Sequence, residues 1–346
     1  MRKGEIINGY TILNDSIPAG GRGEISFARK GDKDYFIKAF LSPKYPVDGS
    51  PGSAKTIADK RKRCEQFEQH HKRLNDSIAT KCTLGGNLVY ALEFFRYGTC
   101  YYKVNEKSDV SSIKAKDVAK LPQDKILIIL KTVSHSLKIL HDLNIVHGDL
   151  KPDNILIKRT ETGSYTTKLI DFDDSYFSKN PPDFTEIVGT PDYYSPELFE
   201  YVKDSGKCGK NELTNKSDIF TLGLIFSEYL CGNKPKFPEK YKSVAEYVAD
   251  NNEIAIDSLP KKIKELINSM LLKNIEQRPD IRQVFETLKS SDILSWSDEP
   301  RKDKPDIKPE PPRPTIRISG NLNKEDKPSS HTTDKPTIRI SGNLKK

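Results

Sequence analysis

The sequence contains few cysteines, and they are spread along the chain. None lies in a Cys-X-X-Cys pair; they are Cys64, Cys82, Cys100, Cys208 and Cys231. Structural zinc sites need clustered thiols, and small disulfide-stabilised domains need a higher cysteine density. We therefore expect neither kind of site, and we interpret these cysteines as reduced thiols in a cytosolic protein.

Long hydrophobic runs are also absent from the sequence. The nearest is ILIIL at Ile126–Leu130, far short of the roughly 20 apolar residues that cross a bilayer. The first ten residues, MRKGEIINGY, do not have the pattern of a secretory signal. These features predict a soluble, cytoplasmic protein without membrane association.

Most of the chain lacks an excess of positive charge. The net charge is +8, but residues 301–346 hold 12 basic and 6 acidic residues, whereas the first 300 hold 45 and 43. Domains that bind nucleic acid usually carry a clear basic surface. The folded part is therefore not expected to bind nucleic acid.

The most informative stretch is HGDLKPDNIL at His147–Leu156. Its polar residues Asp149, Lys151 and Asn154 alternate with leucine and isoleucine residues that can anchor a loop. A carboxylate can accept the proton of an attacking hydroxyl, an ammonium can offset charge on a moving phosphoryl group, and an amide oxygen can bind magnesium. The stretch indicates phosphoryl transfer, although a solvated polar loop has a similar composition.

Two other stretches supply complementary chemistry. Gly20, Gly21 and Gly23 separate two strand-like runs, and the strand FIKAF that follows carries Lys38. Glycines let backbone amides approach phosphates and a strand lysine can pair with them, although a hairpin and a surface lysine use the same residues. In KLIDFDDSYF, Asp171 ends an apolar strand, where its carboxylate suits magnesium.

Together these stretches resemble the serine/threonine protein kinase family. HGDLKPDN is similar to the catalytic-loop pattern HRDLxxxxN, DFD to the DFG motif, and GTPDYYSPEL at Gly189–Leu198 to the segment ending in APE. The glycine cluster and FIKAF resemble the glycine-rich loop and the VAIK strand. The likeness covers Tyr10 to Leu294, with these departures: Ser26, Ala28, Gly148, Asp173 and Ser195 replace glycine, valine, arginine, glycine and alanine.

The resemblance implies a role for each matching residue. Asp149 would orient and deprotonate the acceptor hydroxyl, and Lys151 would offset charge on the γ-phosphoryl group. Thr190, with Lys151, is typical of serine/threonine rather than tyrosine kinases. The nucleotide and metal ligands would be Gly21, Gly23 and Lys38 for the phosphates of ATP, and Asn154 and Asp171 for Mg²⁺.

Further residues would position this machinery. Glu68 on a helix over Ser53–Ile78, or Glu65 as the alternative, would pair with Lys38. Glu106 would offer hinge backbone, with Asn105 beside the adenine pocket. A pair of Glu197 with Arg278 would be structural, and Asp218 would brace the catalytic loop. Asp173 would restrict the backbone after Asp171, as a turn acid or as a contact to a second metal.

The implied fold is α+β and bilobal. A small antiparallel sheet with one main helix would form an N-lobe over residues 1–107, and a mostly helical C-lobe would cover 108–295. The strongest helical periodicity, over Lys125–Asn144, would present the catalytic loop rigidly. The remaining 296–346 have the composition of a disordered tail.

The tail contains a repeat. PTIRISGNL occurs at Pro314–Leu322 and again at Pro336–Leu344. Each copy suits addition to a sheet edge, and each also resembles ligands of forkhead-associated domains, which read phosphothreonine. We hypothesise that the kinase phosphorylates Thr315 and Thr337 and so recruits a partner, a duplicated linker being the alternative.

Two other functions are compatible with parts of the sequence. Gly148 and Asp173 also fit small-molecule kinases of the aminoglycoside and choline phosphotransferase type, but Lys151, the GTPDYYSPEL segment and Arg278 do not. A pseudokinase scaffold is compatible with the altered glycine loop. It does not explain why the complete catalytic set is kept.

Overall fold

The computed structural model describes residues 1–19, 23–82, 86–107, 112–206, 209–254, 256, 259–290 and 293. Contacts divide the chain into a unit from Met1 to Arg301 and a second from Lys302 to Lys346. Gly21, both PTIRISGNL copies, Thr315 and Thr337 lie outside the described residues. No helix in the described part is both long and apolar enough to cross a membrane.

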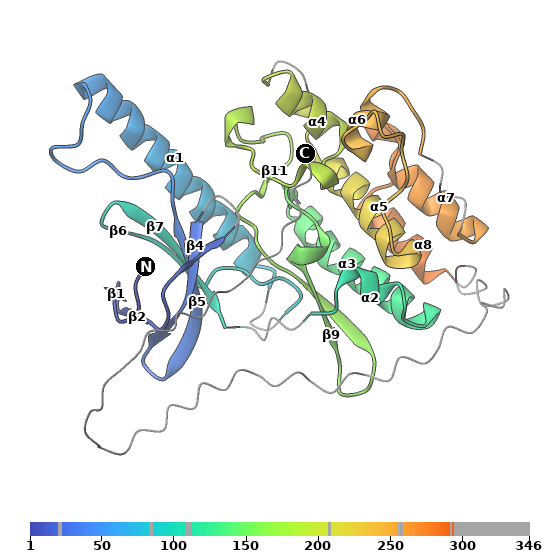
Figure 1. Ribbon diagram of the computed structural model, residues 1–346, viewed down its shortest axis with the longest axis horizontal. Helices are drawn as coiled ribbons and strands as arrows, with labels where there is room; N and C mark the ends of the chain where they lie inside the picture. The colour runs from blue at the N-terminus through green and yellow to red at the C-terminus, as the bar shows by residue number, and fades with distance from the viewer. Residues whose placement is uncertain are drawn as a thin grey trace, which may run out of the picture. The chain divides into compact units, whose positions relative to one another are not determined.

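Seven strands of the described N-terminal part form one antiparallel sheet (Figure 1). Its order is β1-β2-β4-β5-β7-β6, with β3 also paired to β4. The strands are β1 (Ile6–Ile7), β2 (Tyr10–Ile12), β3 (Ile17–Ala19), β4 (Gly23–Lys30), β5 (Lys33–Phe40), β6 (Glu93–Tyr97) and β7 (Cys100–Glu106). Lys38 on β5 lies opposite Lys103 on β7, so the two lysines share one face of the sheet.

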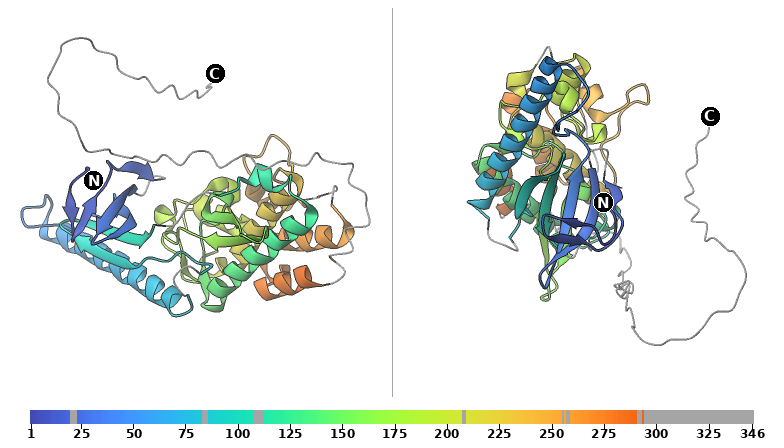
Figure 2. Two further views of the ribbon diagram at one scale, coloured as in Figure 1. Left: turned by 90° about the horizontal axis from the view of Figure 1, so that it is seen from below. Right: turned by 90° about the vertical axis from the view of Figure 1, so that its left-hand side faces the viewer.

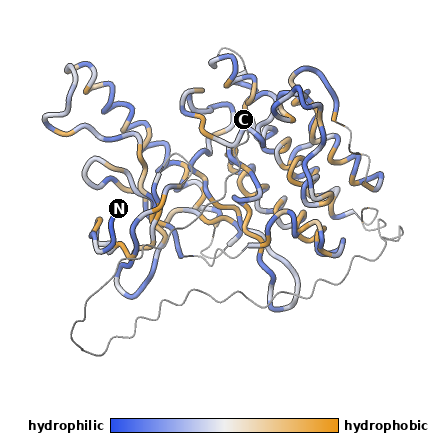
Figure 3. Tube along the Cα trace, viewed as in Figure 1, coloured by the Kyte–Doolittle hydropathy of each residue, from blue (hydrophilic) through white to orange (hydrophobic). Residues whose placement is uncertain are grey.

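One long helix, α1 (Ala54–Ala79), packs against the sheet. It begins where the Ser53 side chain accepts a hydrogen bond from the Thr56 amide at 3.2 Å. Its buried positions are Cys64, His71, Leu74 and Ile78, whereas most of its length is hydrophilic (Figure 3). The helix predicted over Ser53–Ile78 is confirmed, and its inward face includes His71.

The rest of the described unit is mostly helical (Figure 2). The helices are α2 (Ala115–Val118), α3 (Gln123–Asp142), α4 (Pro196–Lys203), α5 (Asn215–Cys231), α6 (Val244–Ala249), α7 (Lys261–Met270) and α8 (Ile281–Lys289). Two short pairs of strands, β8 (Ile145–Val146) with β11 (Tyr176–Phe177) and β9 (Ile155–Arg159) with β10 (Tyr165–Leu169), flank the polar loops. This arrangement confirms the predicted fold class.

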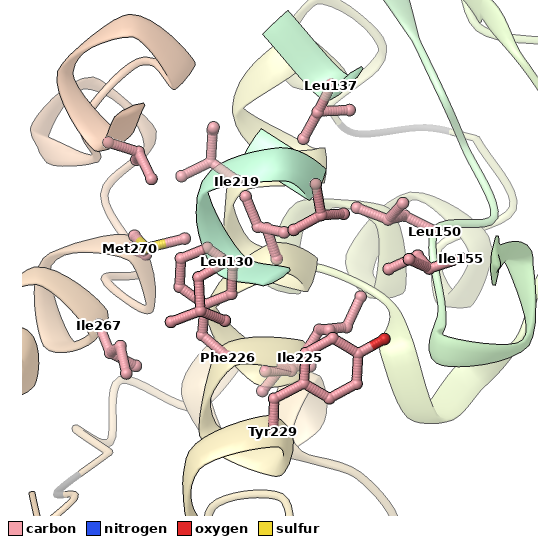
Figure 4. Packing of buried hydrophobic residues seen from close by; sticks show 14 of the residues in the cluster. Leu130, Leu137, Leu150, Ile155, Ile219, Ile225, Phe226, Tyr229, Ile267 and Met270 are labelled. Carbon is pink, nitrogen blue, oxygen red and sulfur yellow. The ribbon is translucent and has the colours of Figure 1, made fainter. Parts of the chain in front are cut away.

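The helical part is built around α3 and α5. Leu130 and Leu137 of α3 are fully buried in one cluster with Ile225 and Phe226 of α5 (Figure 4). Leu150 and Ile155 belong to the same cluster, so the loop between them is anchored in the core at both ends. β7 ends at Glu106 and α2 begins at Ala115, and the predicted lobe boundary at 107/108 falls between them.

Candidate active site

The loop between β8 and β9 brings together the polar groups singled out in the sequence. Lys151 Nζ lies 2.6 Å from Asp149 Oδ2. The Thr190 hydroxyl donates to Asp149 Oδ1 at 3.0 Å and accepts from Lys151 Nζ at 2.9 Å. A carboxylate, an ammonium and a hydroxyl therefore meet at one point, although Thr190 lies 41 residues along the chain from Asp149.

Asn154 closes the same loop from the other side. It ends a 3-10 turn, Pro152–Asn154, and its side-chain amide donates to the backbone oxygen of Asp149 at 2.7 Å. A longer contact of 3.2 Å reaches Asp149 Oδ2. Because the donor end of the amide is used within the loop, its acceptor oxygen is the end that could bind a metal ion.

Asp218, in the first turn of α5, holds the loop from below. Its carboxylate accepts hydrogen bonds from the His147 amide at 2.7 Å and the Gly148 amide at 3.3 Å. His141 of α3 contributes a third contact at 2.9 Å through Nε2. The structure thus places Asp218 where the sequence predicted a brace for the catalytic loop.

Gly148 occupies a conformation that excludes a side chain. Its φ is +80°, and a Cβ at this position would lie 2.2 Å from the backbone oxygen of Asp174. The glycine that replaces the usual arginine is therefore required by the path of the chain after Asp171. The departure from the HRD pattern has a steric cause.

A cleft of about 220 Å³ lies beside this cluster. Lys38, Asn105, Glu106, Asn154 and Asp171, all singled out in the sequence, line it. The remaining lining is largely apolar and comes from both the sheet and the helical part; it includes Ile25, Phe27, Val89, Leu156 and Ile170. A cleft that combines a largely apolar lining with several charged and polar groups suits a planar base attached to a charged chain.

Gly23 begins β4 at the edge of the segment predicted to bind phosphate. A Cβ there would lie 2.6 Å from the backbone oxygen of Ala39. The residue is therefore a glycine at least in part because β4 and β5 approach closely at this point. Gly21 lies outside the described residues.

Lys38 is paired with acids from the segment after β10. Its Nζ lies 3.4 Å from Asp171 Oδ1 and 2.5 Å from Asp173 Oδ2. Asp173 Oδ1 in turn lies 2.6 Å from Lys103 Nζ. Burial lowers the pKa of Lys38, but the charges of Asp173 and Asp171 outweigh it and the net shift is upward. Burial likewise raises the pKa of Asp173, while Lys103 and Lys38 outweigh it and hold that pKa well below its usual range.

The predicted partner of Lys38 on α1 must be corrected. Glu68 pairs instead with Lys72, one turn further along the helix, at 2.5 Å, and Glu65 is exposed. The reason is the helical period: residues four apart share a face, whereas neighbours point about 100° apart. The residue four positions after Phe67 is His71, and it takes the inward position that Glu68 was expected to fill.

A buried ion pair anchors the end of the substrate-side segment. The guanidinium of Arg278 makes two contacts of 2.8 Å to the two carboxylate oxygens of Glu197. Ser217 donates to Glu197 at 2.7 Å, and both charged side chains are almost fully buried. The pair has the position and the bidentate geometry of a structural anchor, as predicted.

Comparison with known proteins agrees with this geometry. A sequence model of the family described as "Protein kinase domain" matches residues 50–288. The chain is 31% identical over 206 residues, 58% of its length, to ovarian-specific serine/threonine-protein kinase Lok of Drosophila melanogaster, covering 39% of that protein. It is 25% identical over 203 residues to serine/threonine-protein kinase nekl-2 of Caenorhabditis elegans, covering 58% of this chain and 53% of that one.

A third relative is calcium-dependent protein kinase 24 of Arabidopsis thaliana, 32% identical over 163 residues, which are 46% of this chain and 26% of that protein. The chain thus spans about half or less of the length of the relatives named here. The family match, however, covers most of the described unit and includes both the Asp149 loop and the Glu197–Arg278 anchor. The chain belongs to the protein kinase domain family.

Proposed function

We propose that the protein is an ATP-dependent serine/threonine protein kinase. The observation that carries the proposal is the adjacency of two sites. Asp149, bonded to Lys151 and Thr190, adjoins a cleft that Lys38, Asn154 and Asp171 line. A hydroxyl acceptor and a nucleotide can therefore be held side by side, which is the chief requirement of phosphoryl transfer.

The donor set fits a magnesium nucleotide. Asp171 offers a carboxylate and Asn154 an amide oxygen, both hard ligands, and Mg²⁺ commonly binds through one or two such groups together with substrate phosphates. When bound, the ion would neutralise charge on the phosphates. The Lys38 ammonium would pair with the same phosphates, and the apolar part of the cleft would cover the base.

Within this proposal the protein's own groups divide the remaining work. Asp149 orients the acceptor hydroxyl and accepts its proton. Lys151, at 2.6 Å from that carboxylate, keeps Asp149 in place and offsets charge as the phosphoryl group moves. Thr190 bonds to both and fixes the substrate-side segment against them.

Phosphate transfer from radiolabelled ATP tests the proposal. The full chain should label serine and threonine of a generic basic protein and should not label an aminoglycoside. Asp149→Asn should lower the rate by about 10²-fold or more, since a positioned base contributes that much. Asp117→Asn, a partly exposed aspartate on α2, is the matched control and should keep the wild-type rate. Transfer to the aminoglycoside alone, or equal rates for wild type and Asp149→Asn, would refute it.

We further propose that the kinase modifies its own tail. Each PTIRISGNL copy carries a threonine, at positions 315 and 337, followed three residues later by isoleucine. Phosphorylated, these threonines would form two linked binding sites, so a partner with two forkhead-associated domains would bind the tail more tightly than a partner with one. Mass spectrometry after incubation with ATP tests this, and no phosphate on Thr315 or Thr337 would remove the idea.

A further inference from the structure

Helix α1 supplies no carboxylate to Lys38 within the described part of the chain. Of its two candidate glutamates, Glu68 is half-buried and pairs with Lys72, and Glu65 is exposed. The inward position belongs to His71, which packs between Phe67 at 4.3 Å and Phe94 at 5.0 Å between ring centroids. The helix face turned towards the sheet is therefore aromatic at this level.

A different carboxylate occupies the place beside Lys38. Asp173 is 4% exposed, and each of its oxygens faces one lysine, Oδ2 towards Lys38 at 2.5 Å and Oδ1 towards Lys103 at 2.6 Å. Lys38 and Lys103 lie opposite each other on neighbouring strands. Two ammonium groups on one sheet face repel each other, and an anion between them offsets this repulsion. Asp173 is in that position.

We propose that Asp173 is the positioning residue for Lys38, in place of a glutamate from α1, with Lys103 holding Asp173 in position. The inference deepens the proposed kinase function and depends on it. Asp173 follows two residues after Asp171, which also contacts Lys38 at 3.4 Å. The segment Asp171–Asp173 thus fixes the position of the phosphate-binding lysine and also contains a predicted metal ligand. Helix α1 contributes no carboxylate to this arrangement; the residue that it turns toward Asp173 is His71.

Steady-state kinetics of phosphate transfer from Mg-ATP, together with Mg-ADP affinity, tests this assignment. Asp173→Asn should lower kcat/KM for ATP by about 10²-fold, the effect of displacing a positioned group by about 1 Å. Glu68→Gln should stay within about twofold of wild type, because Glu68 pairs with Lys72. The reverse pattern, with Glu68→Gln impaired and Asp173→Asn active, would overturn the proposal.

Asp173→Asn removes the charge between two buried lysines, so a loss of folding would mimic a loss of positioning. The double variant Asp173→Asn/Lys103→Met removes one of them, and its proper reference is Lys103→Met alone. We expect both to unfold at similar temperatures, with the double variant about tenfold or more below Lys103→Met in kcat/KM. A folded double variant that equals Lys103→Met would show that Asp173 does not position Lys38.

These outcomes can be distinguished from a failure of the proposed kinase function. If the wild type binds Mg-ADP but transfers no phosphate, the proposed function fails. The Mg-ADP affinities of the same variants then still test Asp173, because Lys38 would contact the nucleotide phosphates in either case. Weaker binding by Asp173→Asn/Lys103→Met than by Lys103→Met supports the positioning role, and equal binding overturns it.

Discussion

Replacement of Gly148 by alanine is the most direct test of the catalytic-loop geometry. Gly148 has φ +80°, and an added Cβ would lie 2.2 Å from the Asp174 oxygen and 3.0 Å from its carbonyl carbon. A left-handed conformation costs a residue with a side chain about 1–2 kcal/mol. The overlap with backbone adds about 1–3 kcal/mol, as is typical when atoms are forced into a packed site.

Gly31 provides a matched control because it separates these two costs. It also has positive φ, +60°, but nothing lies within 4 Å of a Cβ built there. Gly31→Ala should show only the conformational cost, so Gly148→Ala should be less stable by the overlap alone. That difference of about 1–3 kcal/mol corresponds to a melting temperature lower by roughly 2–12 °C, at about 2–4 °C per kcal/mol for a domain of this order of size.

Thermal unfolding by circular dichroism measures the difference, and kinase assays accompany it. Gly148→Ala should also lower phosphate transfer, because relief of the overlap must move either the loop that carries Asp149 or the segment that follows Asp171. Gly148→Arg, which restores the family pattern, should be worse still. A Gly148→Ala variant with the stability of Gly31→Ala and full activity would refute the steric reasoning.

Three further predictions concern the buried polar contacts. Glu197→Gln should reduce the free energy of unfolding by about 3–5 kcal/mol in urea titrations, because it leaves Arg278 buried without its partner charge; an effect below 1 kcal/mol would contradict a buried pair. Burial raises the pKa of Glu197, but Arg278 outweighs this effect and holds the pKa below its ordinary value of 4.5. The ion pair therefore stabilises the folded protein fully above about pH 4.5, and this stabilisation is lost as the pH falls through the lowered pKa. The stability gap between wild type and Glu197→Gln should therefore narrow below pH 4.5, and a constant gap would be inconsistent with that shift. Asp218→Asn should lower kcat about tenfold or more with little change in KM for ATP, since it weakens the hydrogen bonds from the His147 and Gly148 amides that position the loop. An effect confined to KM would show that Asp218 does not position the catalytic loop.

Much of the site could be predicted from the sequence because its geometry is local. Asp149, Lys151 and Asn154 lie within six positions, and a loop anchored in the core by apolar residues leaves them few ways to point. The Glu197–Arg278 pair, 81 positions apart, was expected from the resemblance alone, and it meets the requirement that a buried acid have a cationic partner.

The surroundings of Lys38 could not be predicted in the same way. Its partner could come from α1 or from the segment after β10. Tertiary packing decides which of these carboxylates lies close to Lys38, and the sequence does not specify that packing. Two signals were present in the sequence. His71 lies four residues after Phe67, on the same face of the helix, and Lys103 lies between Tyr102 and Val104 in an apolar strand, where a lysine needs an acid.

The pairing of Lys38 with Asp173 has a pharmacological consequence. A compound that wedges α1 away from the sheet would remove no carboxylate from Lys38, although it would move His71, which interacts electrostatically with Asp173. A compound that reverses the Asp171–Asp173 segment would instead remove both acids from Lys38 at once. Inhibitors of the second type should therefore disable this kinase more completely than inhibitors of the first.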